Sequence, residues 1–567
     1  MENPVEEKQP LISNGKQKGG MRTLPFILAN QGFENMASLG IMPNMILYLT
    51  REYNMDVAVA TNVMLLWSAA TSFMPIIGAF LADSYVGRYP TIAFGSVVSL
   101  LGVLLLWLTA MIPQLSPSCD PITNICSSPT AAQLAFLYLS FVLMAIGAGG
   151  LRASSLAFGM DQLKDKDEGI TEWYFNWNYG VAAVAALIGM TILVYVQENL
   201  GWKVGFGVPV VLMFISMVSF FLGSSFYVKV EAKGNVISNC ARVVVASCRN
   251  KHLNLPLHVS DGMYYCEKDS AVHMPSDKLR FLNKACLIKN PQEDLTQDGR
   301  AKHPWSLCTI EQVEALKALI KIVPIWIAGM SMCLNLSQGS LSVVQASSMD
   351  RHITQHFEIP AASMTTFLVI SAMFWIVLYD RVIIPSASKL RGQPTRLRVK
   401  QKMGIGLFAV CLSAASLAVV EGIRRKIATN EGLQDHPEGV VSMSVLWLLP
   451  KQIFDGFVEV FFGVGQNEFY ICELPQSMSS IGSTLHGLGM SCANLIASLL
   501  LSLVDKVTKG EGKESWVSNN INKGHFDYYC WLIFGVMLIN FFYFFYCSKA
   551  YGPCKGEENE VQDERHC

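Results

Sequence analysis

Long apolar runs separated by polar stretches recur along the whole chain. Twelve runs have about the 20 residues that a helix needs to cross the hydrocarbon core of a bilayer. Because a backbone in lipid must satisfy its own hydrogen bonds, each run is expected to be an α-helix. The pattern therefore predicts an all-α membrane protein with twelve transmembrane helices. They lie near residues 24–49, 60–82, 91–112, 131–157, 174–197, 204–226, 317–344, 364–380, 404–422, 446–470, 483–505 and 527–547.

The runs form two sets of six around one long polar stretch. The predicted organisation is an N-terminal tail (1–23), a six-helix bundle (24–226), a basic linker (227–316), a second six-helix bundle (317–547) and a C-terminal tail (548–567). The tails and even-numbered loops carry more Lys and Arg than the opposite loops, even without the linker, which predicts cytoplasmic tails and a cytoplasmic linker. Two such halves are typical of transporters with a binding site between them.

Composition narrows the class of protein further. Of the 567 residues, 51% are hydrophobic and 15% are charged, whereas soluble proteins have about a quarter charged residues. The net charge of −1 gives no reason to expect a nucleic-acid partner. The chain lacks Gly-x-x-x-x-Gly-Lys, His-Glu-x-x-His and Gly-x-Ser-x-Gly, so neither an enzyme, an ATP-driven pump nor a cofactor is expected. The lipid bilayer is the expected environment.

The loop after the second run has a recognisable pattern. Gly78, Asp83, Gly87 and Arg88 resemble the Gly…Asp…Gly-Arg loop of the major facilitator superfamily. Gly allows a tight turn there, while the Asp and Arg side chains can pair and hold the loop. Continued through Thr91, Ile92, Ser96 and Gly102, the stretch resembles the longer pattern of the proton-dependent oligopeptide transporter family.

Further segments resemble the plant nitrate/peptide transporter branch of that family. They are residues 158–162, 201–207, 357–363, 379–381 and 401–406, and the resemblance covers roughly residues 20–550. It implies the major facilitator fold, two six-helix bundles, alternating access and uptake coupled to protons. Substrates in this branch include nitrate, short peptides, and organic anions such as hormones and glucosinolates.

The first helix carries a polar face. Gln31, Glu34 and Asn35 are spaced so that they share one side of the helix. The family usually has Glu-x-x-Glu-Arg or Glu-x-x-Glu-Lys here, tied to proton coupling, and only the middle carboxylate remains in this chain. We expect Glu34 to be a proton-coupling site, since ionisable groups at bilayer depth are functional candidates. The alternative is that Glu34 pairs with a cation on another helix and is structural.

Two more charges are predicted inside the bundle. Arg152 stands where the family usually has Lys on the fourth helix, and Glu459 lies midway along the tenth. We expect them to pair, with Glu459 as a second proton-coupling candidate. Arg keeps its proton where Lys can lose it, so Arg152 is expected to attract an anionic substrate. An ion pair without substrate contact is the alternative.

The seventh helix supplies neutral candidates for substrate binding. Asn335 stands where some nitrate transporters of the family have His, and Ser337 and Gln338 follow it. With Gln31 and Arg152 they complete the predicted substrate site, although packing between helices is an alternative use of such side chains. Lys317, Lys321 and Lys451 lie near helix ends, where we expect them to extend to the membrane surface.

Together these features predict a proton-coupled secondary transporter for a small anionic solute, with nitrate first among the candidates. The alternatives are an organic-anion or peptide transporter and a transporter-like sensor. The plasma membrane is the first expectation for its location and the vacuolar membrane the second. Glu7, Leu11 and Ile12 fit an acidic dileucine signal that sorting adaptors would bind.

Overall fold

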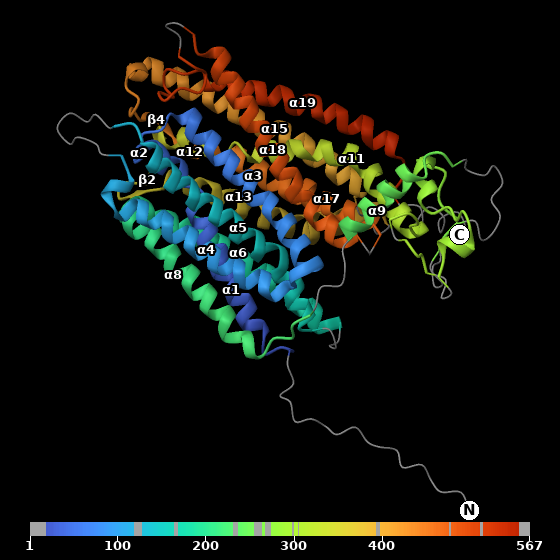
Figure 1. The fold of residues 1–567 in the computed structure, drawn as a ribbon. Coiled ribbons are helices and arrows are strands. Elements are labelled where there is room, and N and C mark those ends of the chain that lie inside the picture. The colour runs from blue at the N-terminus through green and yellow to red at the C-terminus, as the bar shows by residue number, and fades with distance from the viewer. Residues whose placement is uncertain are drawn as a thin grey trace, which may run out of the picture.

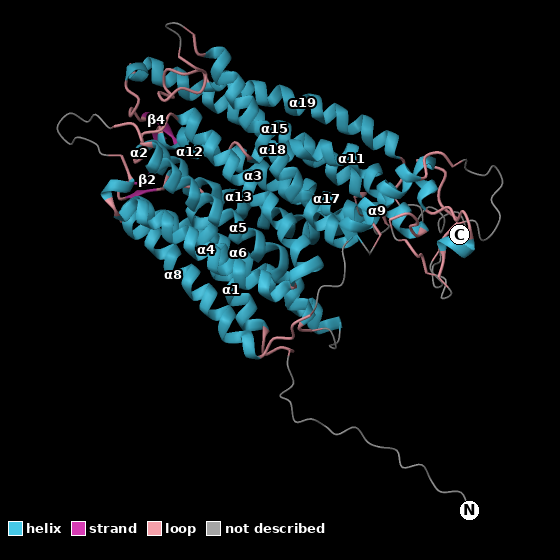
Figure 2. Ribbon diagram, viewed as in Figure 1, coloured by secondary structure: helices cyan, strands magenta, loops and turns pink. Residues whose placement is uncertain are grey.

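The computed structural model describes most of the chain as one helical body, shown in Figures 1 and 2. The described residues are 19–117, 127–163, 168–230, 236–253, 264–266, 274–296, 300–303, 305–392, 397–475, 478–510 and 514–554. The sorting-signal residues Glu7, Leu11 and Ile12 therefore lie outside the described residues, as do parts of the predicted linker.

The helices form two groups. The first group comprises α1 (Leu24–Ile41), α2 (Met45–Arg51), α3 (Val57–Leu81), α4 (Arg88–Met111), α5 (Ala131–Asp161), α6 (Glu168–Ile188), α7 (Val194–Asn199) and α8 (Gly201–Leu222). The second comprises α11 (Ile310–Leu336), α12 (Gly339–Ser347), α13 (Thr366–Leu378), α14 (Ile384–Arg391), α15 (Val399–Asn430), α16 (Leu449–Val458), α17 (Gly465–Glu473), α18 (Ser479–Thr508) and α19 (Phe526–Tyr551).

Several predicted helices contain a break or a wider turn. A π-helical turn occupies Ala82–Val86, Gly189–Leu193, Tyr379–Ile383 and Glu459–Val464. The predicted seventh helix is two helices, α11 and α12, separated at Ser337 and Gln338. The strands are short: β1 (Met349–Asp350) pairs in parallel with β4 (Val441–Ser444), and β2 (His352–Thr354) pairs antiparallel with β3 (Phe357–Glu358).

The prediction of a helical membrane protein is confirmed. Among the described residues, ten helices are long and apolar enough to cross a membrane. The two other predicted spans are helical as well, as α1–α2 and α16–α17. They are the most polar ones: the first holds Gln31, Glu34 and Asn35, and the second holds Lys451, Asp455 and Glu459. The two predicted spans that are not among the ten apolar helices are therefore the ones that carry the predicted proton-coupling residues, Glu34 and Glu459.

Glycines set the spacing of the helices around Arg152. A Cβ added to Gly78 of α3 would lie 2.2 Å from the carbonyl oxygen of Gly149 of α5, and one on Gly147 would lie 2.5 Å from the backbone of Ser99 of α4. No side chain fits at these contacts, so α5 packs directly against both neighbours. This close packing fixes the height and rotation of α5, and thereby the position of Arg152.

The predicted linker is partly folded. It contains α9 (Val236–Arg249) and α10 (Pro291–Asp294). Val243, Leu282, Cys286 and Cys308 form a small apolar core that includes Val313 in the first turns of α11. The linker segment thus packs onto the start of the predicted seventh helix, and it is more than a solvated connection.

Polar contacts between the two groups run from the middle of α3 and α18 to one end of the molecule. Figure 1 shows the start of α1, the end of α19 and α9 at the other end. Asn494 of α18 donates to Ser68 Oγ of α3 at 3.1 Å, and Ser498 donates to Asn62 Oδ1 at 2.8 Å. Beyond them, Arg351 in the turn after β1 forms an ion pair with Glu198 of α7. These contacts hold the groups together at the end remote from the termini.

Candidate functional site

A small pocket with a cationic wall lies in the first group. It has a volume of about 170 Å³ and is lined by residues of α1, α3, α4 and α5, with single contributions from α8 and α18. Arg152 supplies its charge, and its side chain is 36% exposed. Several hydroxyls share the lining: Ser38, Ser68, Thr71, Ser72 and Ser99. Ser38 and Thr71 already donate to Glu34 and to the Trp67 carbonyl, so the fixed cation of Arg152 is the feature of this lining that favours a small anion.

Trp67 adds a donor that sequence analysis missed. Its indole ring stacks on Phe141, with the ring centroids 4.7 Å apart, and it lines the same pocket. The Nε1–H is buried and has no hydrogen-bond partner among the described residues. Since an unsatisfied buried donor is costly, the pocket favours a ligand that accepts a hydrogen bond. A tryptophan in an apolar helix gives no sequence signal that separates this use from packing.

Glu34 is the partner of Arg152. Its Oε1 lies 3.6 Å from Arg152 Nη2, and Ser38 Oγ donates to the same oxygen at 2.8 Å. The Glu34 side chain is only 2% exposed. The pair therefore combines a buried carboxylate with an accessible cation. A solute in the pocket reaches the guanidinium before it reaches the carboxylate.

The predicted pairing of Arg152 with Glu459 is wrong for this structure. Glu459 begins a π-helical turn in the second group, and its titratable neighbours include His486 of α18 and Asp455, whereas the carboxylate paired with Arg152 is Glu34. The two groups make their polar contacts at the end remote from the termini, and Arg152 meets the carboxylate of its own group. The sequence identifies Glu34 and Glu459 as carboxylates inside the membrane, but it does not indicate which of them lies next to Arg152.

His486 is a further titratable residue that sequence analysis missed. Its Nδ1 is buried and lacks a hydrogen-bond partner among the described residues. It sits one residue after Leu485, whose carbonyl accepts a hydrogen bond from Trp326 Nε1 at 2.9 Å. The signal was available, because any ionisable residue inside a predicted span is a candidate.

The polar residues of the seventh predicted helix have different roles. Asn335 is 2% exposed and donates to Asp455 Oδ1 at 2.8 Å, so it is a structural contact and does not line the pocket of Arg152. Gln338 is also buried and donates to the carbonyl of Leu334. Ser337 lines an adjoining pocket of about 250 Å³ that shares Ser68 with the first. Of these three, the structure brings only Ser337 near the candidate site.

The predicted extension of Lys451 to the membrane surface is wrong. Lys451 Nζ lies 2.6 Å from Asp455 Oδ2, and both side chains are at most 5% exposed. Asp455 Oδ1 also accepts hydrogen bonds from Asn335 and from Ser413 of α15. A buried charge persists only when it is paired and hydrogen-bonded, and this cluster satisfies that condition.

Gln31 has an unsatisfied amide oxygen on the same helix as Glu34. Its Oε1 is buried and accepts no hydrogen bond from the described residues. It does not line the pocket of Arg152. The structure thus places Gln31 on the same helix as Glu34, with its amide oxygen unsatisfied.

The loop residues Asp83, Gly87 and Arg88 lie together. Gly87 has a φ of 87°, which favours glycine, and it makes the turn into α4. Arg88 Nε lies 3.1 Å from Asp83 Oδ1, and its Nη1 lies 2.8 Å from Asp161 Oδ2 at the end of α5. The loop is therefore tied to two helices of the first group.

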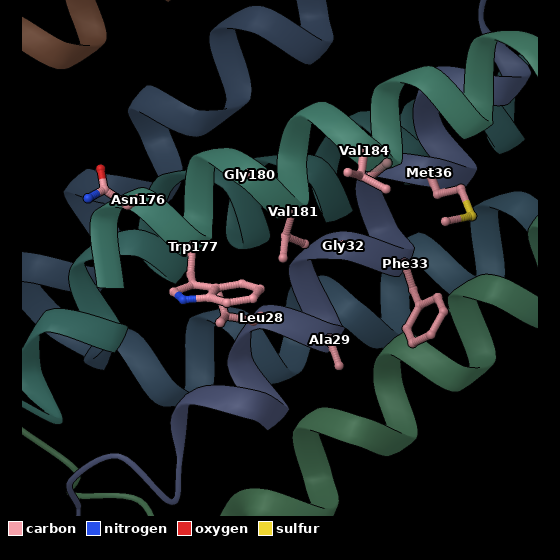
Figure 3. Close-up of a pocket in the computed structure, with 11 residues that line it drawn as sticks. Leu28, Ala29, Gly32, Phe33, Met36, Asn176, Trp177, Gly180, Val181 and Val184 are labelled. Atoms are coloured by element: carbon pink, nitrogen blue, oxygen red, sulfur yellow. The ribbon is translucent and has the colours of Figure 1, made fainter. Parts of the chain in front are cut away.

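A larger pocket lies on another face of α1 and is apolar. Figure 3 shows it between α1 and α6, with Gly32 facing Val181 and with Trp177 and Phe33 at its sides. It has a volume of about 660 Å³ and no charged residue in its lining. Asn176 and Trp177 could donate hydrogen bonds there, but the lining has no cation to neutralise an anion, so the candidate site is the smaller pocket at Arg152.

Comparison with known proteins identifies the family. The POT family model matches residues 89–517. "Protein NRT1/ PTR FAMILY 1.2" of Arabidopsis thaliana is 49% identical over 100% of this chain and 96% of its own length. "Protein NRT1/ PTR FAMILY 1.1" of the same plant is 48% identical over 98% of this chain and 96% of its own length.

Solved structures agree on the fold. The crystal structure of the POT family transporter PepTSo has a TM-score of 0.68 with 17% identity, over 94% of this chain and 98% of that one. An auto-inhibited POT family peptide transporter has a TM-score of 0.67 with 16% identity, over the same shares. With the fold shared and the sequence close to plant relatives over its whole length, this chain belongs to the POT family of membrane transporters, in its plant NRT1/PTR branch.

Proposed function

We propose that this chain is a proton-coupled transporter of a small anionic solute, with nitrate as the first candidate. The observation that carries the proposal is the pocket of about 170 Å³ around Arg152. The Arg152 guanidinium is accessible in this pocket, and hydroxyl side chains share the lining with it. Trp67 lines the same pocket, and its Nε1–H has no partner among the described residues. A small planar oxyanion has several acceptor oxygens, so it suits both the guanidinium and the indole N–H.

Proton coupling follows from the competition for Arg152. Glu34 and a bound anion both neutralise the same guanidinium, so each weakens the binding of the other. Protonation of Glu34 removes the competing charge, and the anion then binds more tightly. By thermodynamic linkage the bound anion raises the proton affinity of Glu34 equally, which favours loading both together.

Alternating access is supported by the distribution of contacts. The two groups are held together at the end remote from the termini, through Ser68–Asn494, Asn62–Ser498 and Glu198–Arg351. We propose that this end faces outward and that the tails and the 227–316 segment are cytoplasmic. Epitope tags at residues 120 and 260 test this orientation: the tag at 260 should be reached by antibody only after permeabilisation.

A larger organic anion is the second candidate. The adjoining pocket of about 250 Å³, lined by Ser337, Ser340 and Asn494, shares Leu39, Met42 and Ser68 with the pocket of Arg152. A solute with a carboxylate on an extended body would use both spaces. Nitrate would need only the first.

Uptake in oocytes separates these candidates. Cells expressing the chain are given labelled nitrate, a dipeptide or an acidic hormone at external pH 5.5 and 7.5. We expect nitrate uptake that is stronger at the acidic pH. Uptake of the hormone or dipeptide without nitrate would overturn the small-anion assignment, and pH-independent uptake would overturn proton coupling.

We further propose the plasma membrane as the site of action. A fluorescent fusion of the full chain locates it in plant cells. If Leu11 and Ile12 form a sorting signal, replacing both with Ala should move the fusion between the plasma membrane and the vacuolar membrane. An unchanged distribution would remove the adaptor as a partner.

A further inference from the structure

A second charged pocket lies far from Arg152, among α14, α15 and α19. It has a volume of about 850 Å³, and its walls are mainly aliphatic and aromatic. Phe408 of α15 and Phe545 of α19 line it and are each more than half exposed. Gly404 also lines it, and a Cβ there would be in van der Waals contact with the Phe544 ring, at 3.5 Å. The pocket thus opens on the outer surface of the second group.

One end of this pocket is cationic. Arg391 is the last residue of α14 and Lys400 is in the first turn of α15, and both line the pocket. Lys400 Nζ lies 5.0 Å from the Tyr551 ring centroid and also donates to the Gly552 carbonyl. Lys400 thus lies against the end of α19, at the end of the molecule where α9 also lies (Figure 1).

The two cations are not neutralised by acids of the described chain. Lys402 is paired with Glu468 at 2.7 Å, whereas the ion pairs of the described residues include neither Arg391 nor Lys400. Asp380 is exposed and does not line the pocket. The cationic end therefore attracts an external anion.

A third observation comes from Tyr379. Its ring packs edge-on against Phe461, with centroids 5.2 Å apart, and it lines the same pocket. The hydroxyl is buried and has no hydrogen-bond partner among the described residues. A ligand with an ester or phosphate oxygen would satisfy it.

From this geometry we propose that the pocket binds an anionic glycerophospholipid of the leaflet on the side of the termini. The acyl chains lie along Phe408, Phe541 and Phe545, and the phosphate lies at Arg391 and Lys400. A basic pocket between membrane helices at their cytoplasmic ends is suited to anionic head groups. The apolar walls exclude a freely soluble anion as the full occupant, because only an amphiphile covers both the aromatic wall and the cations.

Lipid binding to the purified full-length chain tests the assignment. The protein in detergent is titrated with phosphatidylserine or phosphatidylcholine, and bound lipid is counted by native mass spectrometry. Arg391→Gln/Lys400→Gln removes both charges of the site. Lys389→Gln is the control for loss of a nearby surface charge, because Lys389 is exposed on α14 with Arg391 and does not line the pocket.

We expect the double variant to lose preference for phosphatidylserine, by roughly fivefold for each charge removed. The control should keep the preference of the unmodified chain, and phosphatidylcholine binding should be equal in all three. A double variant with unchanged preference would overturn the proposal.

A photoreactive phosphatidylserine with a diazirine in its acyl chain locates the site independently of any variant. Labelled peptides should come from 397–408 and 541–548. If the photolabel were found only on peptides of other helices, such as α1 and α6 at the apolar pocket, the proposal would also be overturned. Neither measurement depends on solute transport, so the lipid site and the proposed function can fail separately.

Discussion

At the scale of single residues, the pocket of Arg152 depends on an unequal pair. Glu34 is covered, with Ser38 as its second contact, while Arg152 faces the pocket. A solute that binds the guanidinium competes with a carboxylate it does not itself touch. Substitutions at the two positions should therefore have different effects.

Replacing Arg152 with Gln should reduce uptake of the anionic substrate by roughly tenfold or more, because a hydrogen bond to a charged group contributes about 1.5–3 kcal/mol. Labelled uptake, normalised to the amount of protein at the cell surface, measures this effect. Arg51→Gln, at an exposed helix end, is the control and should transport normally. Normal kinetics in Arg152→Gln would mean that the anion binds elsewhere.

Replacing Glu34 with Gln should flatten the pH dependence of uptake. The amide mimics the protonated acid in shape and can still accept from Ser38, so Arg152 is free of competition at every pH. Uptake at pH 7.5 should then approach uptake at pH 5.5, and exchange of solute across the membrane should survive. If acid stimulation persists in Glu34→Gln, the carboxylate is structural and coupling lies at Glu459 or His486.

Sequence reasoning found the important residue types and missed some of their partners. Glu34, Arg152 and Glu459 stand out because charge is rare in a membrane span. The partner of Arg152 could not be predicted, since it depends on which helices of the two groups meet in one conformation. Trp67 was missed for a different reason: a free N–H is visible only when its surroundings are known.

At the scale of helices, buried charge joins elements together. Lys451 and Asp455 of α16 contact Asn335 of α11 and Ser413 of α15. Near the strand β4, Glu421 and Arg424 of α15 form a pair with both side chains fully buried, and Gln345 of α12 donates to Glu421 at 2.8 Å. These clusters fix helices that apolar packing alone would leave free to slide.

Breaking the first cluster should destabilise the second group. Lys451→Met leaves Asp455 as a buried unpaired acid, which costs about 3–5 kcal/mol. Lys451→Met/Asp455→Leu removes both charges and should recover much of that loss. The melting temperature of the purified chain, followed by tryptophan fluorescence, measures both. A double variant less stable than the single one would contradict this account.

The folded part of the linker segment can be tested by thiol chemistry. Burial raises the pKa of Cys286 to about 12 and that of Cys308 to about 11, so both thiols stay protonated and covered at neutral pH. Cys248 of α9 is exposed. Iodoacetamide at pH 7.5 should modify Cys248 first and reach the buried pair only after denaturation, as peptide mass spectrometry would show. Equal rates at all three would mean that the apolar core of the segment is not formed.

The helices themselves were largely predictable. Each of the twelve apolar runs corresponds to helix in the structure, because lipid leaves the backbone no other solution. The break at Ser337 and Gln338 and the four π-helical turns were not predicted, since they add or remove less than one turn and leave the hydrophobic pattern intact. The core of the linker was hidden by its polar composition.

At the scale of the whole molecule, the structure is closed at the end remote from the termini. Side chains of α3, α7, α18 and the turn after β1 contribute to the closure, and Asn519 and Thr366 add hydrogen bonds to Asp56 and to the Met190 carbonyl. A transporter that alternates between two open states must break these contacts in every cycle. A covalent link that keeps these contacts formed should therefore stop transport without disturbing the fold.

A cross-link between α3 and α18 tests this requirement. Ser68 Oγ and Asn494 Nδ2 are 3.1 Å apart, so Ser68→Cys/Asn494→Cys should form a disulfide under mild oxidation. Oxidised protein should lose uptake, and dithiothreitol should restore it. The two single-cysteine variants are the controls. Undiminished uptake in fully cross-linked protein would show that this end does not open during transport.

The polarity of α1 also has a consequence for how the protein is made. Glu34 enters the membrane with the first helix, whereas Arg152 is translated about 120 residues later. At ribosomal rates of about 5–20 residues per second, Arg152 is synthesised on the order of ten seconds after Glu34. During that interval the helix must remain at the translocon or hold Glu34 in its neutral form, because lipid disfavours the bare charge. Stable insertion of α1 with an ionised Glu34 thus requires α5, which carries Arg152.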